Sequence, residues 1–518
     1  MKKAPILLGA MVIMFSCGSS QKKQTTATNE QQGISPVSYA NSITSQELKE
    51  ALYTYASDEF EGRETGQPGQ KKAVEYLRNQ YVSMGIPSPI APNDYFQEVP
   101  LEIVEVPEVE LSINGKSFNM LEDFVSLLSS ETGHLSSDEI IYAGYGIEDD
   151  AYSSYDGLDV TGKVVLIKSG EPKNVDGSYV ISNSKKPSKW SKYNQEIAFK
   201  REAAITKGAK AVLFYYPESF KRSVSIYGKS RSNMTIKGKA SEMYYLMIDD
   251  KLANAMLPNI ETESKSKTLK IHFELNYQNN SKSFTSENVL AFIRGSEKPN
   301  EVLVISAHLD HEGVKNGKVY NGADDDGSGT VSILEIAEAF KAAVDSGHTP
   351  KRSILFLHVT GEEKGLLGSQ YYTDFDPIIP LKDIVADLNI DMIGRVDSKH
   401  ENSGRNYLYL IGSNKLSTEL HELSEEINDQ YTNIDFDYTY NDDNDPNRFY
   451  YRSDHYNFAK NNIPVIFYFN GTHADYHQPT DTPDKIRYDL MEERARLIFY
   501  TAWEIANRDG RLEVDKAE

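Results

Sequence analysis

The sequence lacks cysteine almost completely and is poor in positive charge. Among 518 residues there is one cysteine, Cys17, which excludes a disulfide bond within the chain. Lysine and arginine number 55 against 77 aspartates and glutamates, and the net charge is −22. Such a chain is a poor partner for nucleic acid or for an anionic membrane surface. No internal apolar stretch is long enough to span a bilayer. The hydrophobic share of 39% is typical of a globular protein, and the length predicts two or three domains.

The N-terminus has the layout of a secretory signal peptide. Two lysines precede an apolar run from Ala4 to Phe15, and a small residue and Cys17 come next. This order resembles a bacterial lipoprotein signal, although the residues before the cysteine depart from the usual leucine-led motif. We predict a signal peptide over residues 1–16 and a lipidated Cys17 on a polar tether over residues 17–40. The expected location is the cell envelope, on an outer membrane and facing the periplasm. The alternative is an ordinary cleaved signal with an incidental thiol.

The middle of the chain has a different sequence pattern from the C-terminal half. Short β-like runs broken by polar loops extend from about Leu101 to Tyr277, and this region holds no cluster of His, Asp and Glu at ligand spacing. We therefore predict an inserted β-rich domain over residues 106–284 that covers or gates another part of the protein.

After Glu287, strand patterns alternate with helix patterns. The expected strands are Val289–Ile293, Val302–Ala307, Ser353–Val359, Ile384–Asp391, Tyr407–Ile411 and Val465–Phe469. Expected helices are Ser328–Ala343, Ser417–Tyr431 and Asp489–Arg508, and earlier Ile43–Tyr55 with Ser45 as N-cap and Gln70–Met84 ending at Gly85. This alternation predicts an α/β fold, a mostly parallel mixed sheet flanked by helices, built from residues 41–105 and 285–510.

The chemistry gathers where those strands end. His308-Leu309-Asp310 closes one strand, and the next helix opens on Asp324-Asp325-Asp326. An open α/β sheet places its site at the carboxyl ends of its strands. Three adjacent aspartates repel one another unless a cation or solvent neutralises them. The alternative explanation is a solvated acidic turn with a helix N-cap.

Four further clusters stand at or near strand or helix ends: Gly361-Glu362-Glu363, Asn389-Ile390-Asp391-Met392, Arg452-Ser453-Asp454-His455 and Asp475-Tyr476-His477. Carboxylates and imidazoles without cysteine suit Zn²⁺, Mn²⁺ or Co²⁺. A spare glutamate beside a ligand glutamate can take a proton from water. Each cluster alone has an ordinary structural explanation, but five in one chain indicate a site for two metal ions.

Together these motifs resemble the co-catalytic zinc exopeptidases of peptidase family M28, which includes leucine-type aminopeptidases with a phosphorylase/hydrolase-like sheet. The resemblance covers about Ile43 to Leu101 and Glu287 to Asn507. It implies two Zn²⁺ ions per subunit and peptide substrates. The ligands that it implies are His308 and Asp391 for one zinc, Glu363 and His477 for the other, and Asp325 as the bridge.

The same resemblance implies roles around the metals. Glu362 would be the general base, and Asp310 would orient His308. Tyr476 would stabilise the oxyanion, and Arg452 would contact the substrate. Neighbouring residues with no implied ligand role are expected to cap the helix (Asp324 and Asp326) or to lie around the site or on the surface (His311, His358, His455 and His473).

The middle region has a resemblance of its own. The motifs YAGYGI, DVTGKVV and KGAKAV resemble the protease-associated (PA) domain that is inserted in some family members and influences substrate access. We therefore predict an anchored di-zinc exopeptidase, in the first place an aminopeptidase. The alternatives are a carboxypeptidase- or dipeptidase-type member of the fold, a glutaminyl cyclase, or a non-catalytic binding protein on a peptidase scaffold.

Overall fold

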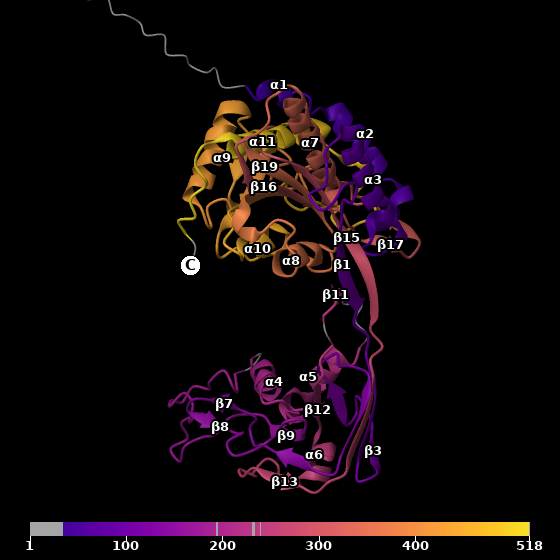
Figure 1. Cartoon of the computed structure of the whole chain (residues 1–518), viewed down its shortest axis with the longest axis vertical. Coiled ribbons are helices and arrows are strands. Elements are labelled where there is room, and N and C mark those ends of the chain that lie inside the picture. Colours follow the sequence, from indigo (N-terminus) through magenta and orange to yellow (C-terminus); the bar gives the residue numbers. More distant parts are fainter. Residues whose placement is uncertain (1–34, 193–194, 230–233, 239, 517–518) are drawn as a thin grey trace, which may run out of the picture.

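The computed structural model describes residues 35–192, 195–229, 234–238 and 240–516. The predicted signal peptide and Cys17 lie outside the described residues. The described part forms two units joined by two long strands (Figure 1). Among the described residues, no helix combines the length and the apolar character needed to cross a membrane.

The larger unit contains a sheet that has nine strands among the described residues. In spatial order they are β11 (Met234–Ile236), β1 (Phe96–Ile103), β15 (Lys282–Ile293), β19 (Arg352–Val359), β16 (Lys298–His308), β20 (Ile384–Ile390), β23 (Val465–Phe469), β21 (Tyr407–Ile411) and β22 (Asp435–Asp437). The centre, from β19 to β23, is parallel, and antiparallel pairs join the outer strands to it. The predicted α/β class and mixed sheet are confirmed. The central strands are rich in apolar residues and almost completely buried because helices cover both faces.

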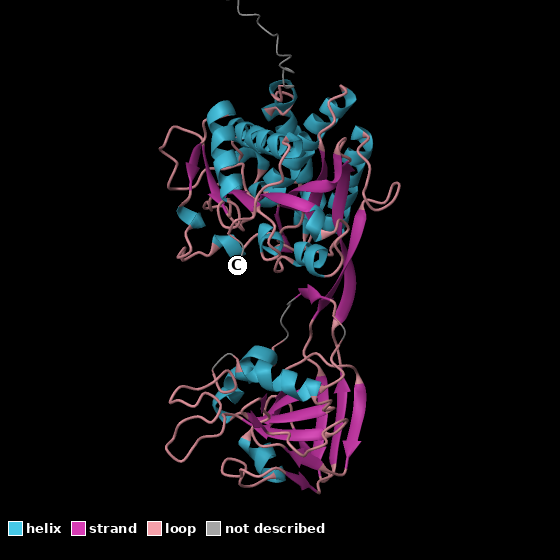
Figure 2. Cartoon of the chain, turned by 60° about the vertical axis from the view of Figure 1, so that its left-hand side comes forward, coloured by secondary structure: helices cyan, strands magenta, loops and turns pink. Residues whose placement is uncertain are grey.

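Helices pack on both faces of this sheet (Figure 2). One face carries α1 (Val37–Ala40), α2 (Ser45–Tyr55), α3 (Pro68–Met84), α7 (Gly329–Asp345), α9 (Thr418–Tyr431) and α11 (Tyr488–Asn507). The other carries α8 (Leu367–Asp374) and α10 (His455–Ala459). The predicted N-cap of α2 is wrong by one residue, because Thr44 accepts the hydrogen bond from the amide of Glu47 and has the extended backbone of a cap. Gly85 ends α3 in the left-handed conformation at φ 68°, as predicted.

The smaller unit lies between β1 and β15 in the chain. It contains a sheet of β13 (Lys267–Leu269), β6 (Ile140–Tyr142), β9 (Val164–Lys168), β10 (Ala211–Tyr215), β12 (Tyr244–Ile248) and β4 (Phe124–Ser126). A second sheet contains β3 (Lys116–Phe118), β2 (Glu108–Ile113), β14 (Phe273–Gln278) and β5 (Gly133–Ser137). The helices are α4 (Glu196–Thr206), α5 (Pro217–Tyr227) and α6 (Asp250–Met256). Strands β6, β9, β10 and β12 are parallel, so this unit is itself an α/β layer and not a set of hairpins.

Outside these sheets, the described residues include two short hairpins and one irregular segment. Hairpin β17 (Gly313–Lys315) and β18 (Lys318–Tyr320) comes after β16, and hairpin β7 (Glu148–Asp149) and β8 (Tyr152–Ser153) extends the smaller unit. The segment η2 (Ala323–Ser328) leads into α7.

Strands β1 and β15 leave the larger unit as a paired antiparallel ribbon. Their register runs from Phe96 opposite Val289 to Ile103 opposite Lys282. Because β15 is antiparallel to β19, with Val289 opposite His358, the carboxyl ends of β19 and its parallel neighbours lie on the side from which the smaller unit departs. The edge of the sheet where a site is expected therefore faces the smaller unit.

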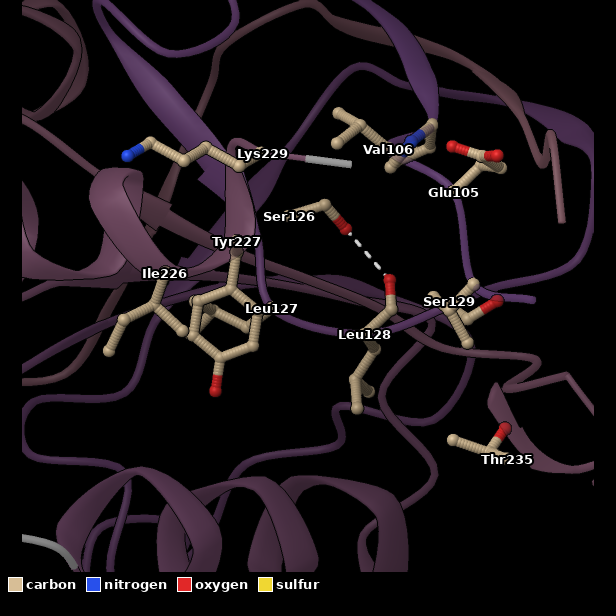
Figure 3. A pocket seen from close by; sticks show the side chains of 12 residues that line it. Glu105, Val106, Ser126, Leu127, Leu128, Ser129, Ile226, Tyr227, Lys229 and Thr235 are labelled. Carbon is tan, nitrogen blue, oxygen red and sulfur yellow. Dashed lines mark hydrogen bonds between the residues drawn. The ribbon is translucent and has the colours of Figure 1, made fainter. Parts of the chain in front are cut away.

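A hollow lies where the ribbon enters the smaller unit (Figure 3). It measures about 210 Å³ and is lined by the linker 104–107, by residues 126–129 and by the end of α5. The Ser126 hydroxyl donates a hydrogen bond to the carbonyl of Leu128 at 2.9 Å on its wall. The lining is mainly apolar, unlike the edge of the larger sheet.

Candidate metal centre

Five polar side chains meet at the carboxyl edge of the parallel strands. His308 is the last residue of β16, Asp391 comes directly after β20, and Glu363 comes four residues after β19. Asp325 lies in η2 and His477 in the loop after β23. Carboxyl ends of neighbouring parallel strands share one edge, so residues far apart in the sequence converge. The structure thus brings together all five residues that were predicted as ligands.

The bridging carboxylate faces two separate groups. Asp325 Oδ1 lies 3.2 Å from His308 Nε2, which is 3.7 Å from Asp391 Oδ1. Asp325 Oδ2 lies 3.0 Å from His477 Nε2, which is 3.2 Å from Glu363 Oε2. The two oxygens of Asp325 therefore face two different groups of potential metal ligands.

Several of these buried atoms have no hydrogen-bond partner. They include His308 Nε2, Asp325 Oδ2 and Glu363 Oε1. A buried polar atom left unpaired costs about 1–3 kcal/mol, so such atoms are rare and need an explanation. Cations would satisfy them, and nitrogen and oxygen donors without sulfur suit zinc. The residues present therefore fit a metal centre.

The neighbours of the ligands hold them in place. Asp391 Oδ2 accepts a hydrogen bond from the Ser453 hydroxyl at 2.6 Å. His308 Nδ1 lies 3.0 Å from the backbone carbonyl of Asp310 and 3.9 Å from its carboxylate. The Asp310 carboxylate instead accepts from the Thr65 hydroxyl at 2.7 Å and the Glu362 amide at 3.1 Å. Asp310 thus contacts His308 through its main chain, and its side chain fixes the start of the Glu362 segment.

Glu362 is positioned beside both clusters but belongs to neither. Its Oε2 is 3.9 Å from His308 Nε2, and its side chain is 12% exposed. Burial raises the pKa of the Glu362 carboxyl well above its usual range, and the carboxylates of Asp391 and Glu363 add to the rise, although His308 opposes it. A carboxylate that is partly open and strongly basic has the properties of a proton acceptor.

The second cluster shows how the charges interact without metal. Burial works to raise the pKa of Glu363, but the imidazoles of His311 and His477 lower it to about 2. Burial works to lower the pKa of His477, but Asp325 and Glu363 raise it to about 10. Because metal ligands must be deprotonated, a metal must displace the proton from His477, and metal binding weakens in acid.

Tyr476 and Arg452 lie at the rim of the site. The Tyr476 ring stacks on His477 with 3.9 Å between centroids, and the Arg452 guanidinium lies 4.9 Å from the centre of the Phe449 ring. Burial raises the pKa of the Tyr476 phenol, and the nearby carboxylates, Asp325 first, raise it further, so the group stays protonated. Tyr476 and Arg452 line a hollow of about 30 Å³ that also touches Asp325, Glu362 and Asp391.

Asp324 and Asp326 tie strand ends to helix starts. Asp326 Oδ1 accepts from the amide of Gly329, the first residue of α7, and from the amide of Met392, both at 3.0 Å. Asp324 Oδ1 accepts from the Gly394 amide at 2.7 Å. The expected capping role therefore fits Asp326 only in part, since both carboxylates mainly connect α7 to the end of β20.

The histidines expected around the site or on the surface are all largely enclosed. His358 and His455 are buried, with His358 Nε2 2.7 Å from the Tyr81 hydroxyl and His455 stacked on Phe467. His473 Nε2 is 3.0 Å from Asp324 Oδ2, with 4% of its side chain exposed. A surface position is therefore wrong for these three. Their hydrophobic or acidic surroundings come from elements distant in the sequence.

The structure places His311 around the site, one of the two positions expected for it, and it adds the buried Arg63, which the sequence analysis missed. His311 is fully buried, with Nδ1 2.8 Å from Glu363 Oε1. Arg63 donates to the carbonyls of Leu309 at 3.1 Å and of Gly322 at 2.8 Å, which joins the loop after β16 to the loop before Asp325. The sequence signal for His311 was the second histidine in His308-Leu309-Asp310-His311, three residues after the first.

Comparison with known proteins adds to this geometry. Residues 288–502 match the model of Peptidase family M28. The chain is a zinc metallopeptidase. The peptidase is 26% identical over 446 residues to a probable leucine aminopeptidase 2 of Aspergillus oryzae, with 82% of this chain and 72% of that protein covered.

Other relatives are covered less completely. Leucine aminopeptidase 1 of Coccidioides posadasii is 30% identical over 227 residues, which is 42% of this chain and 55% of that protein. The peptidase thus spans about half the length of that relative. Among solved structures, an aminopeptidase from Aneurinibacillus sp. strain AM-1 is similar over 93% of this chain and 99% of that chain, with 19% identity and a TM-score of 0.46.

Proposed function

We propose that the peptidase is a co-catalytic exopeptidase with two zinc ions per subunit, and that it removes N-terminal residues from peptides. The observation that carries this proposal is the position of Asp325, whose two oxygens face two different ligand clusters. One cluster adds His308 and Asp391, and the other adds His477, which contacts Asp325, and Glu363, which contacts His477. A carboxylate in this position suits two metals a few ångströms apart.

Bound zinc would supply a Lewis acid that polarises the scissile carbonyl and lowers the pKa of water toward about 7. Glu362 accepts a proton from the attacking water and later delivers it to the leaving amine, as its position beside both clusters allows. The protonated Tyr476 hydroxyl donates a hydrogen bond to the developing oxyanion. The Arg452 guanidinium holds the substrate's main chain at the rim.

The apolar part of the lining of the hollow beside the site favours a substrate with an apolar N-terminal side chain. Besides the polar groups, its lining includes Met392, Phe449, Phe467 and Phe469. An apolar side chain would exclude water from these groups on binding, while a charged one would lose its own hydration. The name of the Aspergillus oryzae relative, a probable leucine aminopeptidase, agrees with this preference.

A substrate panel tests the proposal. Aminoacyl and dipeptidyl substrates, N-terminally blocked peptides with a free C-terminus and a peptide with N-terminal glutamine are offered to zinc-loaded protein, with and without a chelator. We expect release of single N-terminal residues, fastest for leucine-like ones, and loss of activity in chelator. Release of C-terminal residues only would favour a carboxypeptidase, cyclised N-terminal glutamine would favour a glutaminyl cyclase, and no turnover would favour a binding protein.

We further propose the architecture around this activity. Residues 41–105 and 285–510 form the peptidase domain, and the inserted residues 106–284 act as a PA-like domain that restricts access to the edge of the sheet. Lipidation of Cys17 anchors the protein in the cell envelope, on the outer membrane facing the periplasm. Palmitate labelling that persists in Cys17→Ala would contradict the anchor.

A further inference from the structure

His311 stands closer to the second ligand cluster than a residue with only a packing role requires. Its Nδ1 is 2.8 Å from Glu363 Oε1 and 3.8 Å from Asp325 Oδ2. Its ring meets the ring of His477 nearly at right angles, with 5.7 Å between centroids. Atoms of His311, Asp325 and Glu363 all lie within 4.8 Å of one another, a spacing that could hold a metal ion.

A simple hydrogen bond does not account for this arrangement. Both ring nitrogens of His311 are buried and have no hydrogen-bond partner. Despite the short distance, the geometry between His311 Nδ1 and Glu363 Oε1 is not that of a hydrogen bond, and Glu363 Oε1 is unpartnered too. Asp325 Oδ2, 3.8 Å from His311 Nδ1, is unpartnered as well. Three adjacent buried atoms that fail to satisfy one another need a shared partner.

The fold builds a place for this ring. A Cβ on Gly322 would lie 2.5 Å from Cγ and Cδ2 of His311, so only glycine leaves room. The Gly322 backbone has φ +54°, in the left-handed region that favours glycine. Arg63 fixes both sides of this cradle, because it donates to the Gly322 carbonyl and accepts through its own carbonyl from the His311 amide at 3.3 Å.

We propose that His311 Nδ1 is an additional ligand of the metal ion held by Glu363 and His477. This inference rests on the proposed two-metal function. With the bridging Asp325, that metal has four protein donors, the closed set typical of tightly held zinc. The other metal has three, His308, Asp391 and Asp325, which leaves the open position typical of a catalytic ion. The two sites therefore differ in affinity, and the Glu363 site is the tighter.

The variant His311→Asn tests the proposal by zinc affinity, measured by chelator competition and by elemental analysis. Asparagine keeps an N–H donor near the position of Nδ1 but is a poor zinc ligand. We expect wild type to release its two ions in separable steps. In His311→Asn, the tighter step should weaken by more than about 100-fold, since loss of an indirect partner of a ligand costs only roughly 10–100-fold. A loss of about 100-fold or less would be that of a residue that only positions Glu363, and would overturn the proposal.

The buried His358 provides a matched control. It lies in β19 and contacts Tyr81 instead of a carboxylate. His358→Asn should keep both zinc steps of the wild type even if its melting temperature falls. An equal loss of zinc affinity in His358→Asn would assign the effect to general destabilisation, and would overturn the proposal.

Crystallography of the zinc-loaded wild type gives an answer even if His311→Asn does not fold. We expect His311 Nδ1 at about 2.1 Å from a zinc ion. A separation beyond about 3 Å would overturn the proposal. The two hypotheses fail differently: wild type without zinc refutes the proposed function, while two zinc ions in wild type with a distant His311 refute only this inference.

Discussion

The two units of the peptidase place charged residues at the same topological position and use them differently. In the smaller unit, β9 ends at Lys168, whose ammonium group donates to the carbonyls of Ile260, Glu261 and Glu263 at 3.1, 2.8 and 2.7 Å. The buried Lys200 likewise donates to two carbonyls and to Glu196. In the larger unit, the corresponding edge gathers buried donors and acceptors that lack partners.

The difference shows that position at strand ends is not enough to make a metal centre. Both edges are polar, and the hollow at the edge of the smaller sheet is the larger of the two, at about 800 Å³. Its lysine ammonium groups, however, already donate hydrogen bonds to main-chain carbonyls or form an ion pair with a carboxylate. Only the edge with unsatisfied atoms has residual binding capacity for a cation.

The largest effect should come from removing the shared carboxylate. Asp325→Ala takes one donor from each cluster, so we expect loss of both zinc ions by elemental analysis and peptidase activity at the background level. Folding should persist, because the sheet does not depend on this side chain. Full zinc occupancy in Asp325→Ala would show that Asp325 is not a ligand shared by the two zinc ions, and that the edge of the larger sheet does not bind metal in the proposed way.

The next effect separates proton transfer from metal binding. Glu362→Gln removes the proton acceptor but none of the five proposed ligands. We expect about a 10²–10⁴-fold loss of kcat, which is the usual contribution of a general base, with zinc content unchanged. Near-normal turnover on aminoacyl-nitroanilides would exclude Glu362 from proton transfer.

Disruption of the buried ion pair in the smaller unit should affect stability alone. Lys200→Met leaves Glu196 buried without its cation, so we expect a loss of about 3–5 kcal/mol in the free energy of unfolding of that unit. Urea denaturation measures it. Zinc content and kcat on short substrates should stay as in wild type, and a loss of zinc would show that the two units are coupled. The double variant Glu196→Gln with Lys200→Met should recover part of the stability.

The smallest effect concerns a buried acid in α7, away from the metal ligands. Burial, with the carboxylates of Glu338 and Glu47, raises the pKa of Glu335 from 4.5 to about 8. Between about pH 4.5 and pH 8, unfolding therefore releases a proton from Glu335, and the free energy of unfolding falls as the pH rises through this range. Glu335→Gln should match wild type below about pH 4.5 and exceed it above pH 8 by roughly 2–4 kcal/mol. Equal stability of the two proteins at about pH 9 would contradict the raised pKa.

Much of the larger unit can be predicted from local sequence. Buried strands such as Val465–Phe469 are recognisable because apolar runs are bounded by polar turns, and its predicted ends agree with β23. The position of polar clusters near strand and helix ends indicated a metal site, but the choice of the five ligands came from the resemblance of their motifs to a known family. The N-cap of α2 was missed because Thr44 and Ser45 are both favoured N-cap residues, with serine the stronger of the two, and only the backbone conformation decides between them.

The roles of buried histidines could not be predicted in the same way. His311 and His358 received the same expectation from the sequence, and their different roles come from neighbours contributed by other elements, Glu363 for one and Tyr81 for the other. The parallel strands of the smaller unit were also hidden, since short apolar runs do not reveal their pairing.

The paired ribbon of β1 and β15 brings the chain into and out of the smaller unit at neighbouring positions, so this unit can be removed or replaced as a whole. Its entry and exit, Ile103 and Lys282, are partners across one pair of strands, and neighbouring strands lie about 4.8 Å apart. A short turn could close that gap without changing the pairing of β1 with β15, and the larger sheet would lose only its edge strand β11. Gene segments encoding such a unit can therefore be gained, lost or exchanged in a single event while the metal centre keeps its geometry, so the reach of the enzyme can evolve separately from its chemistry.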